Sequence, residues 1–216
     1  MNIEHLDVGR DDEATILIEG LGQELTFVHI TDSHMVECDE RDPDAVEHVE
    51  SIGRSFRGRT PGEVPSSQIF AELIEKSRVQ GADFTALTGD IIHFPSQAAL
   101  DVVDHSAQSL GTPFLYTMGN HDWHFPHLDW NDETRQAHYP RFHTLTNGDP
   151  ACQVLEVGGV RLIALDNSNY LVSDEQVAFL KDQLAMGQPS MLFMHIPLSP
   201  IIFILLQYGY TLIQIY

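Results

Sequence analysis

The chain has 216 residues, which is enough for one domain with a sizeable hydrophobic core and too few for two comfortable ones. Apolar residues make up 43% and charged residues 20%, as in an ordinary globular protein. The formal net charge of −21 repels polyanions, which argues against a nucleic-acid polymer as a partner. Solubility or a salty habitat would explain this acidity as well as a functional reason would. A small anionic ligand would need local positive charge, which bound cations can supply.

Cysteine usage and the first residues indicate where the protein works. Cys38 and Cys152 lie far apart and neither belongs to a CxxC pair, so nothing favours a disulfide between them. Residues 1–5 are polar and acidic and lack the basic and apolar segments of a signal peptide. We therefore expect a cytoplasmic protein without a membrane partner, and the sequence leaves its oligomeric state open.

The first half of the chain alternates predicted strands and helices. Residues 24–31 are rich in β-branched and aromatic residues and predict a buried strand. Residues 41–65 are charged and rich in Gly and Pro, which predicts a loop that could contain a helical turn. Apolar residues at helical spacing predict a helix that is capped by Ser66 or Ser67 and ends at Gly81. A strand, a helix and a strand follow at residues 83–88, 96–110 and 113–118.

The second half begins with a polar, aromatic stretch at residues 123–150, which predicts irregular or partly helical structure. A Gly-Gly pair at 158–159 separates two apolar runs and predicts a β-hairpin. Ser173 caps a third predicted helix, and a last strand covers residues 190–194. Helices between strands, together with one hairpin, predict a layered α/β domain.

Four polar residues, all of metal-ligand types, lie just past the C-terminal ends of predicted strands. In open α/β sheets this edge is where ligands bind. A single polar residue after a strand is usually a cap or a turn former, but four at one edge predict a shared site. The strings that contain them are Asp32-Ser33-His34, Gly89-Asp90, Gly119-Asn120-His121-Asp122 and His195.

The chemistry of these side chains suits a phosphoesterase with two metal ions. Carboxylates bind hard divalent ions and imidazoles bind Mn, Fe and Zn, so the residue types leave the metal open. Two ions about 3.5–4 Å apart would polarise a phosphoryl oxygen and lower the pKa of a shared water. The resulting metal-bridging hydroxide would attack phosphorus in line, and His121 would meet charge on the equatorial oxygens.

On these motifs the chain resembles the calcineurin-like metallophosphoesterase superfamily, from about Phe27 to Pro197. The Asp-x-His form of the first motif is most similar to the cyclic-nucleotide phosphodiesterase-like branch, whereas purple acid phosphatases differ there. Residues 165–167 and the helix after them also resemble family members. The four motifs of the resemblance are Thr31-Asp32-Ser33-His34, Thr88-Gly89-Asp90, Gly119-Asn120-His121-Asp122 and His195.

The resemblance implies a fold and a cofactor. The fold would be α/β, a layered αββα sandwich with two mixed β-sheets flanked by helices. The cofactor would be two divalent metal ions, Mn, Fe or Zn, at the strand ends. Asp32 and His34 would bind the first ion, Asp90 would bridge both, and Asn120 and His195 would bind the second.

The resemblance also implies a reaction, which is hydrolysis of a small phosphodiester or phosphomonoester. His121 would lie close to the leaving-group oxygen, as a general acid or as an oxyanion partner. Asp122 would orient His121. These two residues are the catalytic candidates.

One expected motif is absent. The family has a Gly-His-x-His motif after the position of His195, with one histidine for each ion, but no His, Asp or Glu follows His195 here. We therefore expect an incomplete phosphoesterase domain at residues 1–198 and an apolar tail at 199–216 that is foreign to the fold. The alternative function is a truncated, inactive remnant that binds at most one metal ion.

The tail itself has three interpretations. Residues 201–216 carry no charge, whereas 20% of the chain is charged. They could form a buried β-hairpin around Gly209 or a C-terminal anchor, although a membrane span needs about 20 residues. We favour the third interpretation, the foreign end of a truncated product.

Histidines and aromatic residues near the motifs also have two interpretations. His93, His124 and His127 could replace the missing ligands, with His93 the best of them, but we expect polar loop residues. Three aromatic residues could line a substrate pocket, although loop aromatics more often pack beneath their loop. They are Trp123, Phe125 and Trp130.

Overall fold

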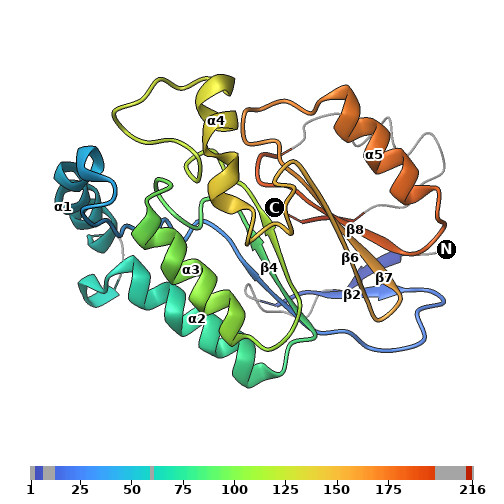
Figure 1. Cartoon of the computed structure of the whole chain (residues 1–216). Helices are drawn as coiled ribbons and strands as arrows, with labels where there is room; N and C mark the ends of the chain where they lie inside the picture. Colours follow the sequence, from blue (N-terminus) through green and yellow to red (C-terminus); the bar gives the residue numbers. More distant parts are fainter. Residues whose placement is uncertain (1–2, 7–12, 59–60, 198–212, 216) are drawn as a thin grey trace.

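A computed structural model describes residues 3–6, 13–58, 61–197 and 213–215 of the chain. Its elements form four layers in the order helices, sheet, sheet, helix (Figure 1). One sheet has the strand order β3-β4-β5 and the other β6-β7-β8-β9. The predicted αββα fold class is confirmed.

The first sheet is parallel. It consists of β3 (Phe27–Ile30), β4 (Phe84–Thr88) and β5 (Phe114–Thr117). The helices α2 (Ser66–Gln80) and α3 (Gln97–Ser109) connect these strands and cover one face of the sheet (Figure 1). The expectation of two mixed sheets is therefore wrong for this sheet over its described strands, because each helical crossover returns the chain in the same direction.

The second sheet is mixed, as expected. Its hairpin joins β6 (Cys152–Val157) to β7 (Val160–Leu165). The turn residues Gly158 and Gly159 have φ values of 55° and 81°, the positive values that this predicted turn requires. The strand β8 (Ser190–Phe193) then lies parallel to β7.

Three residues of the C-terminal tail are placed in this sheet. They form β9 (Ile213–Ile215), which lies parallel to β8. The alternative of a hairpin around Gly209 falls within 198–212, outside the described residues. The origin of the tail stays a prediction.

The helix ends follow the predicted capping with one exception. The helix α5 (Asp174–Leu184) begins with the predicted capping box at Ser173, and Ser96 caps α3. Gly81, with φ 67°, ends α2 as expected. At the start of α2, however, Pro65 occupies the cap position without a side-chain hydrogen bond, so the serine cap was wrong.

The largest difference from the sequence prediction is at residues 41–65, which were expected to form a loop. They contain α1 (Pro43–Arg57), a helix of 15 residues. Its apolar residues recur at helical spacing and pack against Phe94 and Phe125, but the many charges between them hide this pattern. The packed residues of α1 are Ala45, Val49 and Ile52.

Several smaller elements complete the described part of the chain. An antiparallel pair, β1 (Ile3–Leu6) and β2 (Thr15–Ile18), was not predicted. The helix α4 (Asp132–His138) agrees with the partly helical stretch that was expected there. Two short 3-10 helices cover Pro61–Glu63 and Tyr139–Phe142. Both cysteines are free, and no helix among the described residues is long and apolar enough to cross a membrane.

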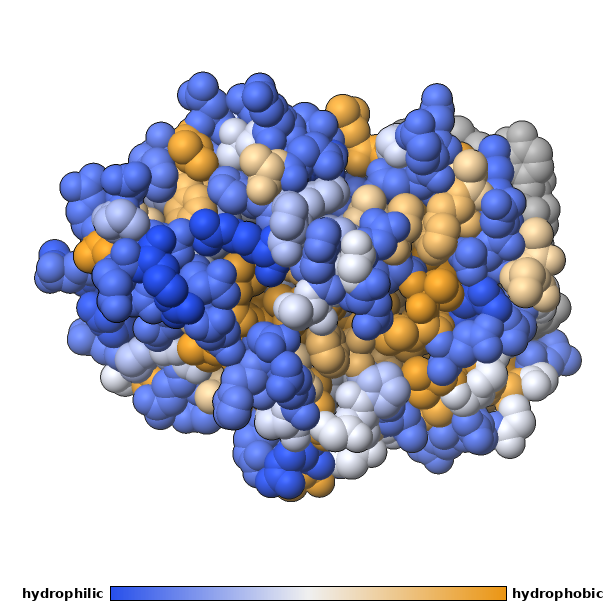
Figure 2. Space-filling model, in the orientation of Figure 1, coloured by the Kyte–Doolittle hydropathy of each residue, from blue (hydrophilic) through white to orange (hydrophobic). Residues whose placement is uncertain are grey.

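Buried apolar side chains hold the four layers together. One cluster lies between α2, α3 and the first sheet, a second between the two sheets, and a third between the second sheet and α5. Phe84 of β4 and Phe193 of β8 meet edge to face between the sheets, with ring centroids 6.3 Å apart. In Figure 2 hydrophilic residues cover the outer parts of this face, and apolar residues show in its middle.

A buried ion pair ties α4 to the end of β7. The Asp166 side chain has no exposed surface, and its Oδ2 lies 2.7 Å from Nη1 of Arg135. Asp166 also accepts hydrogen bonds from the Tyr139 hydroxyl and from the Ser168 amide. These contacts satisfy a carboxylate that water does not reach.

We expect Arg135→Ala to lower the free energy of unfolding by about 3–5 kcal/mol, because the Asp166 charge would stay buried without its partner. Urea denaturation measures this change. The matched control is Arg54→Ala, which removes an exposed ion pair with Glu50 and should cost less than about 1 kcal/mol. Equal losses in the two variants would contradict the expectation.

Candidate metal centre

The loops after β3 and β4 are joined by backbone hydrogen bonds. The Asp32 amide donates to the Gly89 carbonyl at 3.1 Å, and the His34 amide donates to the Asp90 carbonyl at 2.8 Å. Since both strands end at the same edge of a parallel sheet, these bonds place Asp32 and His34 beside Asp90.

Three of these loop residues adopt a left-handed backbone. Asp32, His34 and Asp90 have φ values of 54°, 43° and 50°, and they are three of the six described non-glycine residues with positive φ. Such a conformation costs of the order of 1–3 kcal/mol per residue, and it persists only where surrounding contacts impose it. The backbone strain therefore concentrates where the predicted ligands lie.

Asp32, Asp90 and His195 form one group of ligand atoms that all lie within 4.8 Å of one another. His195 donates from Nδ1 to the Thr88 carbonyl at 2.9 Å, which leaves Nε2 facing Asp90 Oδ2 at 3.4 Å. The Asp90 side chain is 5% exposed and that of Asp32 is 55% exposed, so the group runs from the interior to the surface.

His34, His93 and His121 form a second such group. The Nδ1 atoms of His34 and His93 are 3.2 Å apart, and the rings of His93 and His121 stack at 4.4 Å. The other nitrogen of His34, Nε2, lies 3.6 Å from Asp90 Oδ2 and therefore links the two groups. The loop after β4 turns His93 back onto His121, and the expectation that it is only a polar loop residue stays a prediction.

These donors fit divalent metal ions. Two ligand atoms at 2.0–2.2 Å from one ion lie about 3.0–3.4 Å apart. The His34–His93 and Asp90–His195 pairs fall in this range, and the separation of 3.8 Å between His34 Nε2 and Asp32 Oδ1 needs only a small rotation. Carboxylate oxygens together with imidazole nitrogens suit Mn, Fe or Zn.

Asp90 and His195 change each other's proton affinity. Burial alone would lower the pKa of His195, but the hydrogen bond and the charge of Asp90 outweigh it and raise that pKa to about 9. Burial alone would raise the pKa of Asp90, but the hydrogen bond and the charge of His195 outweigh it and lower that pKa. An incoming cation must therefore displace a proton from His195.

Asp122 has partners different from the one expected. Its carboxylate, on a residue without exposed surface, accepts hydrogen bonds from the amides of Asp90, Ile92 and Gly119. The Tyr116 hydroxyl donates a fourth at 3.1 Å. Burial, followed by the charge of Asp90, raises the pKa of Asp122 to about 7. The expectation that Asp122 orients the His121 ring is not supported, because the Asp122 side chain points inward and holds two loops together.

Asn120 lies between two residues that contact Asp90. The His121 amide donates to Asp90 Oδ1 at 2.8 Å, and a Cβ added at Gly119 would overlap Asp90. The Asn120 side chain itself is half-buried. Its assignment as a metal ligand, like the catalytic role of His121, stays a prediction.

Asn167 is a buried residue to which sequence reasoning gave no role. Its Nδ2 donates to the Ile196 carbonyl at 2.7 Å, and its Oδ1 accepts from the Ile196 amide at 3.1 Å. This two-point contact fixes the backbone directly after His195. The only sequence signal for Asn167 was its place in a segment that resembled family members.

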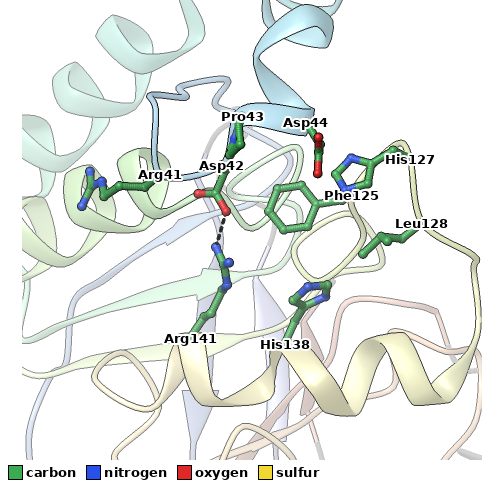
Figure 3. Close-up of a pocket in the computed structure, with 9 residues that line it drawn as sticks. All are labelled: Arg41, Asp42, Pro43, Asp44, Phe125, His127, Leu128, His138 and Arg141. Carbon is green, nitrogen blue, oxygen red and sulfur yellow. Dashed lines mark hydrogen bonds and ion pairs between the residues drawn. The ribbon is translucent and has the colours of Figure 1, made fainter.

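A separate cavity of about 230 Å³ lies beside the start of α1 (Figure 3). His127, one of the substitute ligands considered, lines it together with Phe125. Both arginines of the cavity are ion-paired, Arg141 with Asp42 at 2.9 Å and Arg41 with two aspartates. None of the four motifs contributes to its lining, so this cavity is not the metal centre.

Comparison with known protein families decides the identity of the fold. The family model described as calcineurin-like phosphoesterase matches residues 25–212. The chain belongs to this family. Its members are metal-dependent phosphoesterases, so the family implies a divalent metal, as the donor set does. The match continues beyond residue 198, where the domain boundary was placed, and that boundary stays a prediction.

A solved phosphatase structure shares the fold of this family member, and a second one has a lower similarity. A dimetal phosphatase from Danio rerio has a TM-score of 0.52 and 13% identity, over 82% of this chain and 71% of that chain. A purple acid phosphatase from yellow lupin (Lupinus luteus) seeds has a TM-score of 0.47 and 13% identity, over 78% of this chain and 29% of that chain. No curated protein matches the sequence. The family model confirms the superfamily, and the cyclic-nucleotide branch and the truncation stay predictions.

We expect Gly89→Ala to remove bound metal, because its Cβ would lie 2.6 Å from Cγ and Nδ1 of His195 and displace the ring. Elemental analysis of protein dialysed against Mn²⁺ measures the loss. Gly20→Ala is the matched control, since φ is 88° there against 89° at Gly89 and nothing lies within 4 Å of its Cβ. Full metal content in Gly89→Ala would contradict the role of His195 as a ligand.

We expect Asn167→Leu to weaken Mn²⁺ binding by about tenfold, because residues that orient metal ligands commonly matter this much. Titration calorimetry of the folded variant measures the affinity. Asn169→Leu is the control, since Asn169 contacts Asp132 and Leu171 rather than Ile196. Unchanged affinity in Asn167→Leu would show that Ile196 does not position His195.

Proposed function

We propose that this chain hydrolyses a small phosphomonoester or phosphodiester with two divalent ions. The observation that carries the proposal is the meeting of two donor groups, linked through His34, at loops that follow strands far apart in sequence. The ions would be held by Asp32, His34, Asp90, Asn120 and His195.

Divalent ions bound at this edge would polarise a phosphoryl oxygen and lower the pKa of a bound water. The residues of the chain do the rest. Asp90 supplies a buried carboxylate between two imidazoles, where a cation is favoured and water is largely excluded. His121 supplies a proton to the leaving-group oxygen, and the stacked His93 ring holds the His121 imidazole in place.

A second candidate function is a protein that holds one ion and does not turn over. It is favoured by the position of His34, whose single imidazole faces Asp90 with Nε2 and His93 with Nδ1 and is therefore shared by the two donor groups. His93 argues against it, since its Nδ1 lies 3.2 Å from Nδ1 of His34 and adds a nitrogen donor near Asp90. Metal stoichiometry separates the two candidates.

The decisive experiment measures bound Mn²⁺ and hydrolysis of bis(4-nitrophenyl) phosphate and of 4-nitrophenyl phosphate. We expect about two ions per chain, held by the five ligands named above, and turnover that Asp90→Ala abolishes. Fewer than one ion per chain, with no turnover above the Asp90→Ala control, would exclude the enzyme.

We expect His121→Ala to lower kcat by about 100-fold or more while the chain keeps its metal, because the proton donor is lost and the ligands stay. Metal content and kcat are measured on the same preparation. His105→Ala, on the exposed side of α3, is the matched control and should leave both unchanged. Loss of metal in His121→Ala would make His121 a ligand instead.

A further inference from the structure

An exposed tryptophan stands beside the catalytic candidate His121. Trp130 is 46% exposed, although large aromatic side chains are usually much more buried. The centroid of its indole lies 6.4 Å from that of the His121 imidazole, with the rings edge to face. A small ring attached to a group that is bound at His121 could therefore reach the Trp130 indole.

The indole is held in place from behind. Its centroid lies 4.8 Å from that of Trp123, which is fully buried, and 4.6 Å from that of His124. Trp123 is itself anchored by a hydrogen bond from Nε1 to the Ser168 hydroxyl at 3.0 Å. The next residue, Asn131, caps α4. Trp130 is thus held rigidly while one side of its indole is exposed. A ligand that binds there would therefore cost little side-chain conformational entropy.

None of these neighbours covers a face of the indole in parallel. The interplanar angles to Trp123, His124 and His121 are 56°, 50° and 82°. Elsewhere in the same site the rings are stacked, at 17° for His34 on Phe56 and 26° for His93 on His121. Among the described rings around His121, the indole alone combines high exposure with no parallel partner.

We propose that Trp130 selects phosphate esters whose leaving group carries a planar aromatic ring, which stacks on the indole. This inference rests on the proposed function, because the leaving-group oxygen must lie at His121. The carbon skeleton beyond that oxygen then extends toward Trp130. Stacking of a planar ring adds to the burial of its surface, whereas a saturated ring of the same size gains burial alone. The net charge of −21 restricts these esters to small molecules rather than polyanions.

The test uses two phosphonates that differ only in planarity, benzylphosphonate and (cyclohexylmethyl)phosphonate, whose C–P bonds resist hydrolysis. Titration calorimetry of the Mn²⁺-loaded chain gives the two dissociation constants. We expect the wild-type chain to bind the benzyl compound about threefold to tenfold more tightly. Trp130→Ala should remove this preference and Trp130→Phe should keep most of it. Val79→Ala, at an exposed apolar residue of α2, should leave it unchanged.

Equal affinities in the wild-type chain, a preference that survives in Trp130→Ala, or no binding of either phosphonate would overturn the inference. Hydrolysis of benzyl phosphate and of cyclohexylmethyl phosphate, measured in parallel against Asp90→Ala, separates this failure from failure of the proposed function. If both esters are hydrolysed at equal rates, the role of Trp130 is refuted and the proposed function is not. If the benzyl phosphonate binds more tightly but neither ester is hydrolysed, the proposed function is refuted and the stacking site is not.

Discussion

The buried carboxylate of Asp122 is the interaction on which the metal centre depends. It accepts hydrogen bonds from the amides of Asp90 and Ile92, in the loop after β4, and from Gly119, in the loop after β5. A carboxylate without exposed surface is costly unless its oxygens are paired, so the two loops must keep this arrangement for the fold to be stable. Asp122 therefore fixes the backbone at Asp90 and at Gly119.

Because the loops after β4 and β5 are held together in this way, their atoms approach closely and the backbone is strained nearby. Asp90 lies so near Gly119 that no side chain fits there, and Gly89 leaves similar room for His195. The left-handed backbones of Asp32, His34 and Asp90 are held by backbone bonds between the loops after β3 and β4. Each candidate ligand is thus held by a neighbouring loop as well as by its own strand, and this rigidity would preorganise the site for a divalent ion.

The second sheet contributes support as well as His195. Asn167, just past β7, binds both polar atoms of the Ile196 backbone, while the neighbouring Asp166 is neutralised by Arg135 of α4. The loop before α4 holds Trp123 and Trp130, so the same segment links the second sheet to the substrate side of His121. This side of the chain thereby combines candidate ligands for cations with an exposed aromatic ring.

Much of the fold and part of the site could be predicted from the sequence. The order of strands and helices, the Gly158–Gly159 turn and the place of Asp32, Asp90 and His195 at strand ends depend on local spacing and capping, which the sequence by itself determines. Helix α1 was missed because its charges hide a narrow apolar face. The stacking of His93 on His121, the inward turn of Asp122 and the exposure of Trp130 were decided only by the tertiary structure, since each depends on which distant loop lies against it.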